Sequence, residues 1–386
     1  MSSKPIYWDH NATAPLRRRV KERMLEAFEL YEGNPNSSHT LGQASRAAIE
    51  KSRRTLAATF GCQPGEIIFA ASATESNLIA LWGLWMERTR IKPEHKKILV
   101  SPLEHSSVHE NILFLSEKFG AEIVWMPLGS QGLLDLEKIE KLLKTDDFAF
   151  CTTIGAHNET GLIQPWTELA QLAKEAKVPC HVDLVQCVGR LPFNLHESQI
   201  STAALAFHKV GGPKGISMVY VRDRTKIESI IRGGSQEKKR RAGTENIAAI
   251  VGAEALAEDV RDLEKVFDQK VRTLRDRFEK ELKKKIPEIM IVSEKSPRLP
   301  NTSYIIFPGT KSDALLMSLD FKGICVSSGS ACSSGIVLPS RALLELGYSE
   351  AEAKAAVRFS LGAENSEEEI MEVVNAVQTS VLKLAA

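Results

Sequence analysis

The stretch from 178 to 209, VPCHVDLVQCVGRLPFNLHESQISTAALAFHK, decides the fold. Its two ends, 178–185 and 202–209, are apolar runs with little alternation, which is typical of strands buried on both faces of a sheet. One crossover separates them, so the two strands are expected to run parallel. Asp183 and Lys209 then lie at the carboxyl ends of two strands, the edge where open α/β sheets bind ligands.

Runs of the same kind lie on either side of this stretch. They cover 96–102, 121–128, 148–156 and 216–222, and helical patterns such as 166–177 separate several of them. Alternating strands and helices predict right-handed crossovers and a mostly parallel central sheet in a large α/β domain.

A long amphipathic helix is predicted over 247–285, where no proline occurs and Gly252 is the only glycine. We expect this helix to join the large domain to a smaller α/β domain. The predicted large domain spans 15–255, and the small domain combines 1–14 with 256–386.

Composition excludes several classes of protein. The 386 residues are 43% hydrophobic and 26% charged with a net charge of +1, which argues against disorder, a coiled coil, and nucleic-acid or membrane binding driven by bulk charge. The basic run at 237–241 is expected to be a solvated loop. No apolar run approaches the roughly 20 residues of a membrane span, and no secretory leader is recognisable. Six cysteines without a CxxC pair argue against disulfides or a metal site, so we expect a cytoplasmic protein.

The pair of Lys209 and Asp183 suggests a particular cofactor. An amine that can form an imine, near a buried carboxylate that can hold a protonated pyridine nitrogen, is what pyridoxal 5'-phosphate requires. The segment SATESN at 72–77 follows an apolar run and opens a helix, so its N–H groups are placed to bind a phosphate. Taken singly, each feature has a plainer explanation: a solvated strand end, or a helix cap without a ligand.

Three more residues are candidates for a catalytic or binding role. His105 follows the strand-like run at 96–102, and Asn158 follows the run at 148–156, which places both at the same sheet edge. Cys332 lies in SSGSACSSG at 327–335, among small residues that suit an exposed thiol on a pliable loop rather than a core cysteine. A plain loop cysteine is the alternative for that position.

Together these segments resemble the cysteine desulfurases of the nitrogen-fixation and iron–sulfur-cluster type, within the class V, fold-type I pyridoxal-phosphate enzymes. The resemblance runs almost the whole length of the chain. It rests on YWDHNATAP, GNPNSSH, SATESN, LEHSSV, HNETGLIQP, HVDLVQ, FHKVGGPKG, RRAGTEN, SSGSACSSG and VRFSLG. It implies conversion of L-cysteine to L-alanine, with the sulfur passed to an enzyme cysteine as a persulfide.

The resemblance also implies a role for each matching residue at the cofactor. Lys209 would bind the cofactor covalently and then move protons, Asp183 would pair with the pyridine nitrogen, and His105 would stack on the ring and assist proton transfer. Asn158 and Gln186 would contact the ring-hydroxyl side. The phosphate would be held by Ala73, Thr74 and His208.

Further roles concern the substrate and the partners. Arg358, with Asn158 nearby, would hold the substrate carboxylate, and Cys332 would attack the substrate sulfur. Thr244 would reach the phosphate of the neighbouring subunit, which implies a homodimer with shared active sites. The persulfide would go to an acceptor protein such as an iron–sulfur scaffold, or to thio-modification.

Some positions depart from the family pattern and keep alternatives open. Ala206 stands where a serine is usual, which removes one phosphate hydroxyl, and His10 and Ser72 also differ from the usual residues. A selenocysteine lyase or a class V aminotransferase would share the fold, although amino transfer has no use for Cys332. A weakly active scaffold that binds the cofactor is the third possibility.

Overall fold

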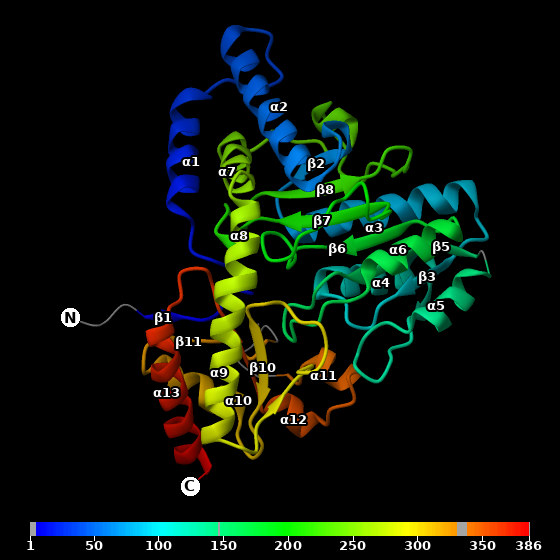
Figure 1. The fold of residues 1–386 in the computed structure, drawn as a ribbon. Helices are drawn as coiled ribbons and strands as arrows, with labels where there is room; N and C mark the ends of the chain where they lie inside the picture. Colours follow the sequence, from blue (N-terminus) through cyan, green and yellow to red (C-terminus); the bar gives the residue numbers. More distant parts are fainter. Residues whose placement is uncertain (1–4, 146, 330–337, 386) are drawn as a thin grey trace.

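The computed structural model of the chain describes residues 5–145, 147–329 and 338–385. A seven-stranded sheet lies at its centre, in the order β2-β8-β7-β6-β5-β3-β4 (Figure 1). Its strands are β2 (Ile67–Ala70), β3 (Lys97–Val100), β4 (Glu122–Trp125), β5 (Phe148–Ile154), β6 (Cys180–Asp183), β7 (Thr202–Ala206) and β8 (Ser217–Val221). Each run predicted to be a strand in this part of the chain therefore contains one.

The sheet is mostly parallel, as predicted. Strands β4, β3, β5, β6 and β7 run in one direction, and β8 runs against both of its neighbours, β7 and β2. The connection from β7 to β8 spans 207–216, which is shorter than the dozen or more residues that a parallel crossover needs. The reversal of β8 follows from that short connection.

Helices cover both faces of this sheet. On one face, Ile98 and Val100 of β3 belong to a core cluster with residues of α3 (Ala73–Ile91) and α4 (Ser106–Phe119). On the other, Leu99 packs in a cluster with residues of α5 (Leu136–Leu143) and α6 (Trp166–Glu175). The alternation along β3 is the period of two that a strand imposes on its side chains.

The helix predicted over 247–285 is helical nearly throughout, but it is not one regular α-helix. It consists of α7 (Ile247–Ala257), α8 (Val260–Val266), a π-helical turn η4 (Phe267–Val271) and α9 (Arg272–Lys285), with a turn at 258–259. The wider π turn takes up an extra residue, and both Phe267 and Val271 remain buried. In Figure 1 this column passes beside the seven-stranded sheet and on to the C-terminal elements.

The C-terminal third forms smaller sheets that include the beginning of the chain. Strand β1 (Ile6–Tyr7) pairs in parallel with β11 (Ile324–Cys325), and β9 (Met290–Ile291), β10 (Thr302–Ile306) and β12 (Ala356–Ser360) form an antiparallel sheet. The remaining α-helices are α1 (Arg18–Leu30), α2 (Thr40–Phe60), α10 (Ser312–Asp320), α11 (Arg341–Glu345), α12 (Glu350–Lys354) and α13 (Glu367–Ala385). The division into a large domain of 15–255 and a small domain of 1–14 with 256–386 stays a prediction. Within the described ranges, none of the helices is long and apolar enough to cross a membrane.

Candidate active site

A cavity of about 230 Å³ opens at the carboxyl edge of the large sheet. Most of the residues predicted to bind a cofactor line it: Ala73, Thr74, His105, Asn158, Asp183, Gln186, His208 and Lys209. Arg358 lies next to them, because its Nη1 donates to the Asn158 carbonyl oxygen over 3.1 Å. Thr244 is exposed and does not line this cavity, and Cys332 falls outside the described residues.

The N-terminus of α3 provides one end of the cavity. Ser72 caps the helix: its Oγ accepts from the Glu75 N–H over 3.2 Å, and its carbonyl oxygen accepts from the Ser76 N–H over 2.9 Å. The N–H groups of Ala73 and Thr74 precede the first intrahelical bond, so they are available to an anion. His208 lines the same cavity, and burial lowers its pKa to about 4, which leaves a neutral ring there. These groups fit a phosphate.

Asp183 ends β6 as a buried carboxylate with both oxygens engaged. Its Oδ1 accepts from the Val185 N–H over 3.0 Å, and its Oδ2 accepts from Asn77 Nδ2 over 2.9 Å. Only 4% of the residue is exposed, and it lines the cavity. A carboxylate held this firmly fits the protonated nitrogen of a pyridine ring.

Lys209 follows β7 and reaches the cavity from the short helix η2 (His208–Val210). Its Nζ donates to the Asn11 carbonyl oxygen over 2.9 Å. Burial, together with the positive charges of Arg190 and Arg358, lowers the pKa of this amine to about 7, while Asp183 acts in the opposite direction. A neutral amine is the nucleophilic form, so the site prepares Lys209 to react with a carbonyl group near neutral pH.

His105 has a second function as the N-cap of α4. Its Nδ1 accepts from the Ser107 N–H over 3.1 Å and lies 2.8 Å from Ser107 Oγ. A nitrogen that accepts from a backbone amide carries no proton, so in the neutral ring the proton lies on Nε2. Burial is the main cause that lowers the His105 pKa, and Lys209 adds to it. The predicted stacking and proton transfer would therefore use the ring face and Nε2.

Arg358 lies on β12 with one part of its guanidinium unused by the described residues. Nη2 donates to Asp9 Oδ1 over 2.6 Å and Nη1 to the Asn158 carbonyl, whereas the buried Nε has no acceptor in ranges 5–145, 147–329 and 338–385. A buried donor without a partner is costly, so the group fits an anionic ligand such as a carboxylate.

Several residues of the site carried no role in the sequence-based prediction. Asn11 accepts from Lys209, Asp9 pairs with Arg358, and Asn77 supports Asp183. Arg190 is 1% exposed and donates to the carbonyl oxygens of His10 and Lys209. The segments YWDHNATAP and SATESN contain three of these residues and drew attention as segments, but the contacts come from distant parts of the chain.

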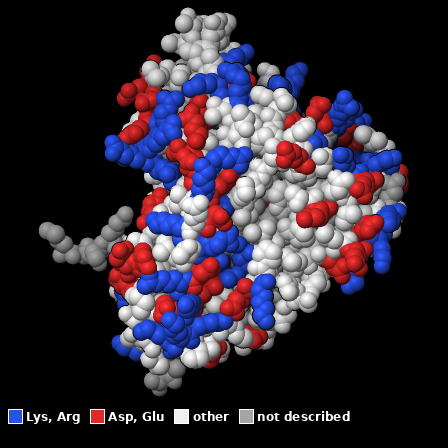
Figure 2. Space-filling view, in the orientation of Figure 1, with Lys and Arg blue, Asp and Glu red and all other residues white. Residues whose placement is uncertain are grey.

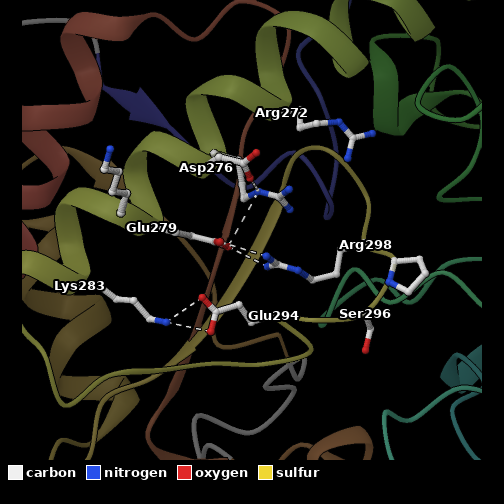
Figure 3. A pocket seen from close by; sticks show the side chains of 10 residues that line it. Arg272, Asp276, Glu279, Lys283, Glu294, Ser296 and Arg298 are labelled. Atoms are coloured by element: carbon white, nitrogen blue, oxygen red, sulfur yellow. Dashed lines mark hydrogen bonds and ion pairs between the residues drawn. The ribbon is translucent and has the colours of Figure 1, made fainter.

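A second cavity, lined mainly by charged side chains, lies away from the candidate active site. This cavity lies beside α9 and has a volume of about 530 Å³. Figure 3 shows that Glu279 pairs there with Arg298 and Lys283 with Glu294. None of the residues predicted for the active site lines it. Over the face shown in Figure 2, basic and acidic side chains alternate rather than form a patch of one sign.

The run at 237–241 is a correction to the prediction of a solvated loop. Glu237 is only 6% exposed and forms two short contacts with the guanidinium of Arg53, of 2.7 and 2.8 Å. Arg241 pairs with Glu75 of α3 over 2.6 Å. A charge-rich pattern does not show that a single acidic member turns inward to pair with a distant arginine.

Comparison with known proteins identifies the family. The model of the class-V aminotransferase family matches residues 6–373. The chain belongs to this family. The cysteine desulfurase IscS of Dictyoglomus turgidum is 36% identical over 99% of this chain and 95% of its own length, and the cysteine desulfurase NifS of Azotobacter vinelandii is 35% identical over 98% and 93%.

Solved structures agree with this family assignment. A NifS-like protein superimposes with a TM-score of 0.90 at 32% identity, covering 98% of this chain and 100% of that one. A NifS-like protein from Rickettsia africae superimposes with a TM-score of 0.86, also at 32% identity, covering 97% and 99%. The predicted fold, that of fold-type I pyridoxal-phosphate enzymes with a mostly parallel sheet, is confirmed.

Proposed function

We propose that this chain is a cysteine desulfurase that converts L-cysteine to L-alanine and passes the sulfur to a cysteine of the enzyme. The observation that carries the proposal is the cavity itself. An anion site at α3, a buried carboxylate at Asp183 and an amine of lowered pKa at Lys209 face one space. The relatives named above as cysteine desulfurases match nearly the whole chain, which selects this reaction among those of the family.

The cofactor is pyridoxal 5'-phosphate, and the residues of the cavity fit it. When bound, it supplies an electron sink that lets the substrate carbon lose a proton. Ala73, Thr74 and His208 would hold its phosphate, and Asp183 would hold its ring nitrogen. Asn158 and Gln186 would contact the ring-hydroxyl side.

The chain's own residues then bind the substrate and move protons and sulfur. Arg358, with Asn158, holds the substrate carboxylate through the guanidinium nitrogens, of which Nε has no acceptor among the described residues. Lys209 takes and returns protons at Nζ, and His105 assists at Nε2. Cys332, as a thiolate, attacks the substrate sulfur. A sulfur–sulfur bond forms, the bond between the substrate β-carbon and sulfur breaks, and the β-carbon takes a proton to become the methyl group of alanine. The enzyme keeps the sulfur as a persulfide.

A homodimer that shares its active sites is part of the proposal. Helix α1, the residues just before it and the start of α2 expose several large apolar side chains, namely Leu16, Leu25, Phe28, Leu30 and Leu41. These helices lie together at one end of the molecule in Figure 1. A second copy of the chain would bury this surface and would bring Thr244, which is exposed here, to the neighbouring phosphate.

The destination of the sulfur and the compartment complete the proposal. A persulfide carries sulfur in a form that another thiol can accept, so the partner would be an acceptor protein such as an iron–sulfur scaffold, or a system that makes thio-modified products. The described cysteines, Cys62, Cys151, Cys180, Cys187 and Cys325, are free thiols, which agrees with a reducing cytoplasm.

The deciding experiment measures alanine and sulfide released from L-cysteine by the purified holoenzyme in the presence of a thiol reductant. Wild-type protein should release equal amounts of both, and Cys332→Ser should release neither, because no thiolate is left to take the sulfur. An aminotransferase would be insensitive to Cys332→Ser, and L-selenocysteine as the preferred substrate would indicate a lyase for that amino acid. A cofactor-loaded wild-type protein that releases no alanine would overturn the proposal.

A further inference from the structure

A chain of buried hydrogen bonds runs behind Asp183, away from the cavity. Thr202 Oγ1 lies 2.9 Å from His181 Nδ1, and His181 Nε2 lies 3.0 Å from Asn77 Oδ1. Asn77 Nδ2 in turn donates to Asp183 over 2.9 Å. Thr202, His181 and Asn77 are 0% exposed, and none of the three lines the cavity.

The direction of each hydrogen bond in this chain is determined. Asp183 as a carboxylate can only accept, so the Asn77 amide must turn its NH₂ toward Asp183 and its Oδ1 toward His181. His181 must then donate from Nε2. Burial lowers the pKa of His181 to about 4, so its ring is neutral and Nδ1 can only accept. The Thr202 hydroxyl therefore donates to Nδ1, and every member of the chain has one possible orientation.

The same asparagine connects this chain to the other side of the site. Its Nδ2 also lies 2.8 Å from Ser107 Oγ, which in turn lies 2.8 Å from His105 Nδ1. The amide of Asn77 thus supports the carboxylate that faces the ring nitrogen and the serine that orients the stacking imidazole. Burial of a polar group costs free energy unless the group is hydrogen-bonded, and each of the side chains named here has a hydrogen-bond partner.

We propose that His181 and Thr202 are positioning residues that act through Asn77 to keep Asp183 oriented as the acceptor for the cofactor's ring nitrogen. The inference rests on the proposed function. Without the donor at His181 Nε2, the buried Asn77 oxygen loses its partner, so the amide is less firmly held and its Nδ2 donates less well to Asp183. The carboxylate then has a weaker hydrogen-bond donor and becomes more basic, so it draws the proton that it shares with the ring nitrogen.

The test uses holoenzyme loaded with pyridoxal phosphate that carries ¹⁵N in its ring. The nitrogen resonance of wild-type protein should lie at the pyridinium position. In His181→Phe it should move toward the position of unprotonated pyridine, and alanine formation should fall about tenfold, mainly in kcat, as expected for loss of one hydrogen bond to a charged group. His181→Gln can place a donor near the Nε2 position and should restore most of the wild-type shift.

Matched variants separate positioning from packing. His95 is also buried, at 4% exposed, but it is not part of these hydrogen bonds: its Nδ1 lies 3.1 Å from the Phe148 carbonyl oxygen. His95→Phe should therefore keep the wild-type resonance. If His181→Phe does not fold, Thr202→Val removes only the hydroxyl donor and should give a smaller shift in the same direction. An unchanged resonance in both His181→Phe and Thr202→Val, or in Thr202→Val where His181→Phe does not fold, would overturn the inference. If wild-type protein shows the pyridinium signal but releases no alanine from cysteine, the proposed substrate fails while the positioning chain stands.

Discussion

At the scale of the residue, the environment of Lys209 determines when the enzyme can accept its cofactor. Burial and the nearby arginines lower its pKa to about 7, so the amine is neutral above that pH and protonated below it. We predict that the rate at which cofactor-free protein takes up pyridoxal phosphate rises about tenfold per pH unit below 7 and levels off above it. The growth of absorbance of the bound cofactor measures this rate. A rise that continues to pH 9 would show an amine with its ordinary pKa.

Lys209 also shows how much of the site can be predicted from the sequence. A strand end followed by a glycine-rich turn predicted the place of Lys209, and the order of the motifs predicted its neighbours in the cavity. Lys209 donates to the carbonyl oxygen of Asn11, which lies about 200 positions earlier in the sequence. The positive charge of Arg190, which lowers the Lys209 pKa, also comes from a different part of the chain. Periodicity contains no information on such long-range contacts, so the pKa of Lys209 could be stated only from the structure.

At the scale of the element, one buried ion pair attaches η3 (Gln236–Lys239) to α2. Glu237 accepts from both terminal nitrogens of Arg53 and from the Phe69 N–H, in a segment where Glu237, Lys238 and Lys239 all have positive φ. We predict that Glu237→Ala lowers the free energy of unfolding by about 3–5 kcal/mol, because Arg53 stays buried without its only buried carboxylate partner among the described residues. Urea titration measures the change.

Glu50 provides the matched control for that prediction. It also pairs with Arg53, over 3.1 Å, but its side chain is 47% exposed. Glu50→Ala should therefore cost about 1 kcal/mol or less. Equal losses for Glu50→Ala and Glu237→Ala would mean that burial of the pair does not determine its contribution.

Elements were easier to predict from the sequence than their connections. Strands β3 to β8 follow from continuous apolar runs, and the helical column from α7 to α9 follows from apolar periodicity; both are local properties of the sequence. The turn at 258–259, the π turn at Phe267–Val271 and the inward Glu237 depend on what packs against them, which no local pattern contains. Cys332 lies outside the described residues, so its predicted role rests on the resemblance and on the proposed experiment.

At the scale of the whole molecule, the proposed dimer makes the active site a property of two chains. Thr244 is exposed in the single chain, three residues after Arg241, which pairs with Glu75 of the same chain over 2.6 Å. Thr244 could thus bind the phosphate in its own subunit or in a second copy. The two arrangements predict different activities for a dimer in which one subunit carries a defect at Lys209 and the other a defect at Thr244. Lys209→Ala removes the amine from its own site, whereas Thr244→Ala weakens the phosphate site that Thr244 serves.

Co-expression of the two variants with different affinity tags allows the mixed dimer to be purified and assayed. If Thr244 serves the neighbouring subunit, the subunit that carries Thr244→Ala keeps its own Lys209 and receives an intact Thr244 from its Lys209→Ala partner. One site in the mixed dimer is then complete, and it should release alanine at about half the wild-type rate under limiting cofactor, where either variant alone is nearly inactive. If Thr244 serves its own subunit, both sites of the mixed dimer are defective and activity stays at the level of the single variants. The rate of the mixed dimer thus shows whether this chain completes its active site alone or only with a second copy.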